Sequence, residues 1–111
     1  MAAARRNQQR NQLPEIEWLA ADVEQAPETV FASQPDLIVV DPPRTGLHPK
    51  AAEKIVAAAA PNLFYVSCNP ATLARDLPRF LRASYDVVRL QPVDMFPHSY
   101  HVEALVWLRR K

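Results

Sequence analysis

The sequence predicts an α/β fold: one domain over residues 1–111, built on a mostly parallel sheet with helices on both faces. Apolar runs alternate with segments of helical periodicity, which is typical of parallel strands joined by helices. The clearest run, 36–41, holds four consecutive apolar residues and indicates a strand buried on both faces. The chain has a single glycine, Gly46, whereas cofactor-binding sheets of this class place glycines in the turn after their first strand. Either the fold is of another kind, or the first strands of the sheet lie outside these residues.

The first third of the chain holds helical and extended segments. Residues 2–12 favour a helix but have almost no apolar face, and Pro14 ends the segment. Residues 15–20 alternate between acidic and apolar side chains, which predicts a strand. Asp22 follows and can cap a short helix over 23–31, a span that also contains a proline.

A buried strand and a helix are predicted in the middle of the chain. The strand at 36–41 ends at Asp41, and the two prolines that follow carry the chain away from the sheet in an extended form. We therefore expect Asp41 at the carboxyl end of a strand. After a turn, Pro49 is a favourable first helical residue, and the apolar residues behind it form one face of a helix that Pro61 stops.

A second apolar strand is predicted at 63–66, and the only cysteine, Cys68, follows it closely. Asn69 is a natural N-cap and Pro70 a natural first residue of a helix. Because the N-terminus of a helix stabilises negative charge, this position suits a reactive thiolate. The alternative is that Cys68 is a small buried hydrophobic residue, which is a common environment for a free cysteine.

Two more strands are predicted, at 86–90 and 101–108, with an irregular segment at 92–100 between them. His98 and His101 resemble a metal-binding pair or a base for a thiol. Two histidines without a third suitably spaced ligand are weak evidence for zinc. A thiol hydrolase that pairs the cysteine with one of these histidines remains open.

Composition and charge exclude several classes of protein. The formal net charge is +1, which makes no case for nucleic-acid binding, and the arginine clusters near both ends are expected to be solvated. One cysteine excludes an internal disulfide and any metal site built from cysteines alone. There is no apolar run long enough to span a bilayer and no signal-peptide pattern. We expect a protein of the reducing cytoplasm that does not act on membranes.

Four polar positions fall at or near the ends of the predicted strands: Asp22, Asp41, Cys68 and Glu103. Such ends converge on one crevice in an open α/β sheet. A thiol beside carboxylates suits covalent catalysis followed by proton removal. Asp22 could instead be only a helix cap and Asp41 only a turn residue. Glu103 stands in an apolar run, which is unusual for an acidic residue unless it is paired or starts the strand.

Three motifs resemble those of the RNA uracil-C5 methyltransferases, and the resemblance is closest to the bacterial 23S ribosomal RNA branch of that family. The motifs are DPPR at 41–44, SCNPATLARD at 67–76 and DMFPHSYHVE at 94–103. They match the family in order and spacing, and together they are highly specific. Members of this family use S-adenosylmethionine to make 5-methyluridine in tRNA and ribosomal RNA. The resemblance covers essentially the whole chain but only the latter part of the family's catalytic domain.

The resemblance implies roles in catalysis and in cofactor binding. Cys68 would add to uracil C6, which makes C5 nucleophilic, and Glu103 would later remove the C5 proton. Asp41 would line the pocket for the cofactor and the base. Asp22 would contact the adenine of the cofactor, although Ala21 stands where the family more often has glycine.

The resemblance also implies the substrate contacts and the partners. Arg44 and Asn69 would bind the substrate, while His98 and His101 would belong to the scaffold of the third motif. The cofactor would be S-adenosyl-L-methionine and the partner RNA, ribosomal RNA in preference to tRNA, with no metal and no protein partner. The implied fold is a partial Rossmann-like class I methyltransferase sheet that lacks its first strands, so we expect little or no turnover from the isolated chain.

Two alternatives are kept. The chain could be a non-catalytic remnant of such an enzyme that binds RNA or a partner, although the low net charge argues mildly against tight RNA binding. It could also be an amino-group methyltransferase, because those share an Asp-Pro-Pro motif. They typically follow it with an aromatic residue, where this chain has Arg44, and they need neither Cys68 nor Glu103.

Overall fold

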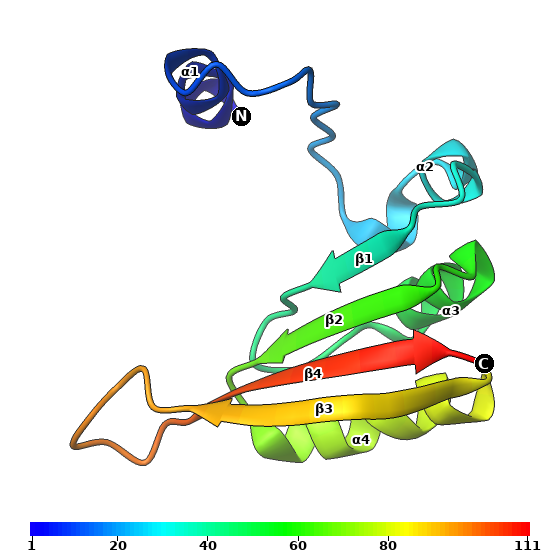
Figure 1. Cartoon of the computed structure of the whole chain (residues 1–111), viewed down its shortest axis with the longest axis vertical. Coiled ribbons are helices and arrows are strands. Elements are labelled where there is room, and N and C mark those ends of the chain that lie inside the picture. The colour runs from blue at the N-terminus through cyan, green and yellow to red at the C-terminus, as the bar shows by residue number, and fades with distance from the viewer.

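The centre of the molecule is a four-stranded sheet with the strand order β1-β2-β4-β3 (Figure 1). The computed structural model describes all residues, 1–111. The strands are β1 (Leu37–Val40), β2 (Asn62–Ser67), β3 (Tyr85–Val93) and β4 (Glu103–Arg110). The helices are α1 (Ala2–Arg10), the 3-10 helix η1 (Val23–Gln25), α2 (Glu28–Ala32), α3 (Pro49–Ala58) and α4 (Pro70–Arg82). None of these helices has the length and apolar content that a membrane crossing requires.

The sheet is mixed, which corrects the prediction of a mostly parallel one. β1 and β2 pair in parallel, whereas β4 runs antiparallel to both of its neighbours, β2 and β3. α3 connects the parallel pair, as expected for strands linked by a helical crossover. Only the irregular segment 94–102 connects β3 to β4, and neighbouring strands joined without a crossover pair in antiparallel fashion.

Helices α3 and α4 lie behind the sheet in Figure 1, so within these residues they cover one face and not both. α3 links β1 to β2 and α4 links β2 to β3, and both connections move in the same direction across the sheet. Because such crossovers are right-handed, they place their helices on the same face. On the other face the rings of Phe64 and Trp107 stack with centroids 5.8 Å apart, and Val39 is 62% exposed.

The hydrophobic core lies between the sheet and the two covering helices. Along β2 and β4, buried side chains that face the helices alternate with half-buried ones on the open face. Three rings extend this core toward α4: Tyr65 meets Phe80 edge to face with centroids 6.5 Å apart, and Phe80 meets Tyr85 in the same way at 6.4 Å. Such pairs contribute about 0.5–1.5 kcal/mol beyond the burial of their surface.

Both covering helices begin at the prolines that the sequence predicts. α4 begins at Pro70, and Asn69 caps it, because its Oδ1 accepts a hydrogen bond from the N–H of Ala71 at 3.0 Å. α3 begins at Pro49, and the ring Nδ1 of His48 accepts the backbone N–H two residues further on at 3.3 Å. Each cap satisfies a backbone donor that the helix itself cannot pair, so the cap fixes where the helix begins.

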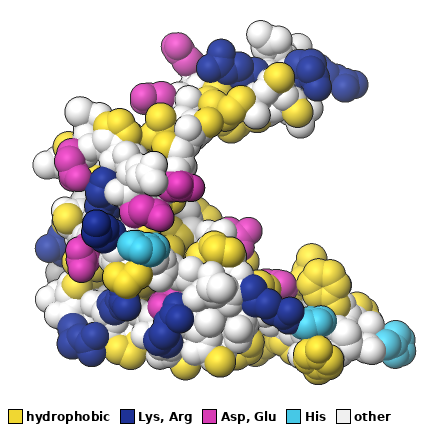
Figure 2. All heavy atoms as spheres, turned by 180° about the vertical axis from the view of Figure 1, so that it is seen from behind, with side chains coloured by type: hydrophobic (Ala, Val, Ile, Leu, Met, Phe, Trp, Pro, Cys, Tyr) yellow, Lys and Arg dark blue, Asp and Glu magenta, His cyan; other side chains and the backbone are white.

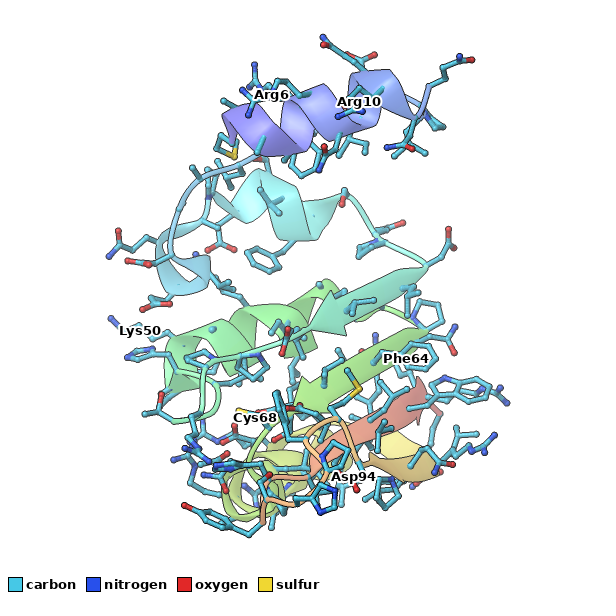
Figure 3. The ribbon with its side chains drawn as sticks, turned by 90° about the vertical axis from the view of Figure 1, so that its left-hand side faces the viewer. Arg6, Arg10, Lys50, Phe64, Cys68 and Asp94 are labelled. Carbon is cyan, nitrogen blue, oxygen red and sulfur yellow. The ribbon has the colours of Figure 1, made fainter.

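The N-terminal segment is where the prediction of a strand is wrong. Residues 15–20 pair with no strand, and Leu19 is exposed. A strand needs a neighbour to satisfy its backbone groups, and the sheet ends at β1 without reaching this segment. α1 has no buried residue, and a hollow separates it from the body of the molecule in Figure 2. Its Arg6 and Arg10 lie well away from Cys68 (Figure 3).

We expect Phe80→Ala to lower the free energy of unfolding by about 3–5 kcal/mol, because it leaves a cavity among packed rings. Phe80 is 0% exposed and Leu81, its neighbour on the same helix, is 43% exposed. Leu81→Ala is therefore the matched control and should cost less than about 1 kcal/mol. Urea denaturation followed by circular dichroism measures both changes. Equal losses would contradict the placement of the core on the α4 side of the sheet.

Candidate active site

Two cavities flank the loop that follows β1, residues 41–48. The larger cavity, of about 760 Å³, is lined by Asp22 and Asp41, and we name it the acidic cavity. The smaller, of about 360 Å³, is lined by Cys68, Arg44 and Asn69, and we name it the thiol cavity. The structure thus brings together the two residues predicted to bind the cofactor, and it separately brings together the thiol and the two residues predicted to bind the substrate.

Cys68 lies between the last residue of β2 and the N-cap of α4, half-buried and not in a disulfide. Ser67 shapes this turn, because its Oγ accepts the N–H of Asn69 at 3.2 Å and its hydroxyl lies 3.0 Å from the Asn69 carbonyl oxygen that it donates to. The thiol therefore stands where the carboxyl end of a strand meets the positive end of a helix dipole. Because Cys68 lines a cavity, a fully buried structural cysteine does not describe it.

Glu103 is the first residue of β4 and lies at the same end of the sheet as Cys68. β2 and β4 pair in antiparallel fashion as far as Ser67 opposite Ala104, and Cys68 and Glu103 are the next residue of each segment, although Glu103 lines neither cavity. Ser67 and Ala104 are buried on the helix-covered side. Since side chains alternate along a strand, Glu103, next to the buried Ala104 in β4, belongs to the open side. Glu103 is half-buried and forms no ion pair.

Three carboxylates line the acidic cavity, those of Asp22, Asp41 and Glu24, together with the side chains of Arg75 and Arg79. Asp22 precedes η1, yet its side chain makes no capping hydrogen bond; its backbone carbonyl accepts the N–H of Gln25 at 2.9 Å instead. The alternative role of Asp22 as a side-chain cap is therefore not seen. Asp41 follows the last residue of β1 and is exposed, and the buried side chains of Leu47 and Ile55 supply apolar wall to the same cavity.

The thiol cavity is also lined by three residues of the third motif, Tyr100, His101 and Val102. The guanidinium of Arg44 donates a hydrogen bond to Nδ1 of His101, whose ring packs on Tyr100 with centroids 4.4 Å apart. Both His101 and Tyr100 line the cavity, whereas His98 lines neither cavity. The scaffold role of His101 stays a prediction, and Tyr100 was not singled out from the sequence. Their one signal was their place in the motif that ends at Glu103.

Asn69 has a structural partner for each polar atom of its side chain. Nδ2 donates to the carbonyl oxygen of Arg44 at 3.3 Å, and Oδ1 caps α4. Contact of Asn69 with a substrate stays a prediction, and what the structure shows is a link between the helix of the thiol and the loop that carries Arg44. Among residues 1–111, no three His, Cys, Asp or Glu side chains are grouped so as to hold a metal ion.

Comparison with known proteins agrees with this arrangement. A crystal structure of the tRNA (uracil-54, C5)-methyltransferase of Pyrococcus abyssi, in complex with S-adenosyl-L-homocysteine, matches 95% of this chain with a TM-score of 0.79 and 35% identity. RNA methyltransferases described as uncharacterized, from Clostridium tetani and Bacillus cereus, are 43% identical over 109 residues and 46% identical over 113 residues, which is 98% and 100% of this chain. The chain is therefore similar, in fold and in sequence, to methyltransferases that act on RNA.

The sequence model of the tRNA (Uracil-5-)-methyltransferase family matches residues 29–111, and the chain belongs to this family. The family predicted from the three motifs is thereby confirmed. The chain spans 24% of the length of the Clostridium and Bacillus relatives and 25% of the Pyrococcus chain.

The loop between the cavities requires glycine at position 46. Gly46 has φ +81°, and a Cβ added there would lie 2.4 Å from Nη2 of Arg75 and 2.5 Å from Oδ2 of Asp76. We expect Gly46→Ala to lower the free energy of unfolding by about 1–3 kcal/mol, from left-handed strain and steric overlap.

Ala59→Gly is the control for Gly46→Ala in the same denaturation experiment. Ala59 is also left-handed, with φ +55°, at the end of α3. Glycine there should stabilise the chain by about 0.4–1 kcal/mol, because glycine adopts this conformation without a steric penalty. If both substitutions lower the free energy of unfolding, the left-handed conformation does not decide the sign of the stability change.

Proposed function

We propose that this chain is the part of an RNA uracil-C5 methyltransferase that carries out the covalent chemistry, with S-adenosyl-L-methionine as methyl donor and a uridine in RNA as acceptor. The observation that carries the proposal is that Cys68 directly follows β2 and Glu103 begins β4 at the same end of the β2–β4 ladder. Membership of the family supports the reaction, and the bound S-adenosyl-L-homocysteine of the Pyrococcus enzyme supports the cofactor.

The acidic cavity fits such a cofactor in size and in chemistry. Small-molecule pockets commonly enclose about 300–1,000 Å³, and this cavity encloses about 760 Å³. Asp22 and Asp41 would accept hydrogen bonds from the amino groups of the cofactor, and Leu47 and Ile55 would contact its apolar parts. When bound, the cofactor supplies an electrophilic methyl group.

Cys68 in the thiol cavity and Glu103 at the start of β4 would account for the remaining chemistry. The Cys68 thiolate forms a bond to uracil C6, and the electrons of the C5–C6 double bond move onto C5 and the adjacent carbonyl, which makes C5 nucleophilic. After C5 has gained its methyl group, Glu103 takes the C5 proton. The electron pair left behind re-forms the double bond and expels the thiolate. Arg44 faces this reaction with its guanidinium and would bind a carbonyl oxygen or a phosphate of the nucleotide.

We further propose ribosomal RNA as the substrate and the cytoplasm as the location. The likeness of the three motifs to the bacterial 23S ribosomal RNA branch supports the first, although the Pyrococcus neighbour is a tRNA enzyme by its description. Methylation of 23S ribosomal RNA fragments and of tRNA transcripts, compared under the same conditions, decides between the two substrates. Because the relatives are about four times as long, activity is measured on a polypeptide that joins these residues to the upstream part found in the relatives.

We expect Cys68→Ala to abolish methyl transfer to uridine in that polypeptide, by at least about a thousandfold, because the activating bond to C6 cannot form. RNA that contains 5-fluorouridine should trap a covalent protein–RNA complex with Cys68 and none with Cys68→Ala, as seen by denaturing electrophoresis. Methylation that survives the substitution would overturn the proposal. Unmodified RNA that binds without ever forming an adduct would favour the non-catalytic alternative.

We expect Glu103→Gln to lower the rate of product release by about 10²–10⁴-fold, because an amide cannot take the C5 proton. The thiol still adds and the methyl group still arrives, so a methylated covalent complex should accumulate on unmodified RNA. Label from the methyl-labelled cofactor that stays with the protein after denaturation measures this complex. Asp94→Asn, in the exposed loop before β4, is the matched control and should leave turnover unchanged. Slow turnover without any accumulated complex would exclude Glu103 as the base.

A further inference from the structure

The loop after β1 is the wall between the two cavities. Its residues from Asp41 to His48 line the acidic cavity, with the single exception of Arg44, which lines the thiol cavity instead. The N–H of Gly46 donates to the carbonyl oxygen of Pro43 at 2.8 Å, which closes the loop into a tight turn. Any displacement of this loop therefore changes both cavities together.

Four hydrogen bonds from Asn69 and the first turns of α4 hold the backbone of the loop. The carbonyl oxygen of Arg44 accepts hydrogen bonds from Nδ2 of Asn69 and from the hydroxyl of Thr72, both at 3.3 Å. The carbonyl oxygen of Thr45 accepts a hydrogen bond from Nη2 of Arg75 at 2.7 Å. Beyond the turn, the N–H of Leu47 donates to Asp76. α4, which follows Cys68, therefore also holds the loop between the two cavities.

Asp76 makes the one attachment that is buried. Its side chain is 0% exposed, although it sits in a helix. Oδ2 accepts the N–H of Leu47 and the hydroxyl of Tyr65, each at 2.8 Å, and Oδ1 accepts Nε and Nη2 of Arg75 at 3.0 and 2.9 Å. A charged acceptor with four donors of fixed direction defines a position far more sharply than the exposed contacts of Arg44 do.

We propose that Asp76, together with Arg75, is a positioning residue that sets the separation between the acidic cavity and the thiol of Cys68. This inference rests on the proposed function, because it assigns the two cavities to the methyl donor and the acceptor. Asp76 itself lines neither cavity, so it acts through the loop and through Arg75, which it holds and which lines the acidic cavity. Misplacement of reacting groups by about 1 Å can lower the rate roughly a hundredfold. The carboxylate of Asp76 prevents such a misplacement.

The first test measures the position of the loop and needs no activity. Cys68 is the only cysteine, so a nitroxide attached to it has one location. Its paramagnetic broadening of the amide signals of Thr45, Gly46 and Leu47 reports their distance from Cys68. We expect Asp76→Asn to change this broadening and to speed hydrogen exchange of the Leu47 amide at least about tenfold, because the amide group of asparagine replaces one acceptor oxygen with a donor.

Two further variants separate position from stability. Asp86→Asn is the matched exchange of an exposed carboxylate, which pairs only with Lys111 at 3.1 Å, and it should leave the loop signals unchanged. Tyr65→Phe removes the donor on the core side but keeps the bonds to Leu47 and Arg75, so it should lower the melting temperature without moving the loop. If Asp76→Asn leaves the broadening as it is, or Tyr65→Phe moves the loop equally, the positioning role is overturned.

The second test uses the polypeptide with its upstream part and separates two reactions. Exchange of the uracil C5 proton with solvent does not need the acidic cavity. Methyl transfer needs both cavities, at the correct distance from each other. We expect Asp76→Asn to lower methyl transfer by roughly a hundredfold while proton exchange changes by less than about threefold. An equal loss of both reactions would overturn the inference. A displaced loop in Asp76→Asn, combined with no proton exchange in the unsubstituted polypeptide, would support the positioning role and refute the proposed function.

Discussion

The buried carboxylate of Asp76 is the interaction on which the arrangement of this molecule depends. A carboxylate without exposed surface is costly to remove from water, by several kcal/mol, unless it is paired and hydrogen-bonded. Arg75 supplies the charge at 2.9 Å, and Leu47 and Tyr65 supply neutral donors. Burial, and then the hydrogen bond to Asp76, raise the pKa of Tyr65, so its hydroxyl remains a donor at every physiological pH. Sheet, loop and helix are joined at this one point.

Much of the fold and part of the site could be predicted from local patterns. The apolar runs located β1 and β2, and the Asn-Pro pair located the start of α4, because strand burial and helix capping are properties of a few adjacent residues. The positions of Cys68 and Glu103 followed from motifs in which chemistry limits the residue types. Asp22, Asp41, Cys68 and Glu103 were expected at one crevice. Asp22 and Asp41 line one cavity, whereas Cys68 lines the other and Glu103 lines neither.

The rest depended on contacts that local patterns do not contain. Residues 15–20 have the alternation of a strand, but alternation cannot supply the neighbouring strand that their backbone needs. Asp76 stands in a helix where a charged residue usually meets water, and only Leu47 and Tyr65, distant in sequence, make its burial favourable. The contact between Arg44 and His101 is likewise set by packing of the third motif against the loop.

The direction of β4 has a chemical meaning. A sheet of parallel strands collects only strand ends at one edge, whereas an antiparallel strand contributes its beginning there. β2 ends next to Cys68 and β4 begins at Glu103, so a thiol and a carboxylate share an edge. Had β4 run parallel to β2, the six residues of β2 would separate them by about 20 Å, at about 3.3 Å per residue. One reversed strand thus brings two distant sequence positions to the same edge of the sheet.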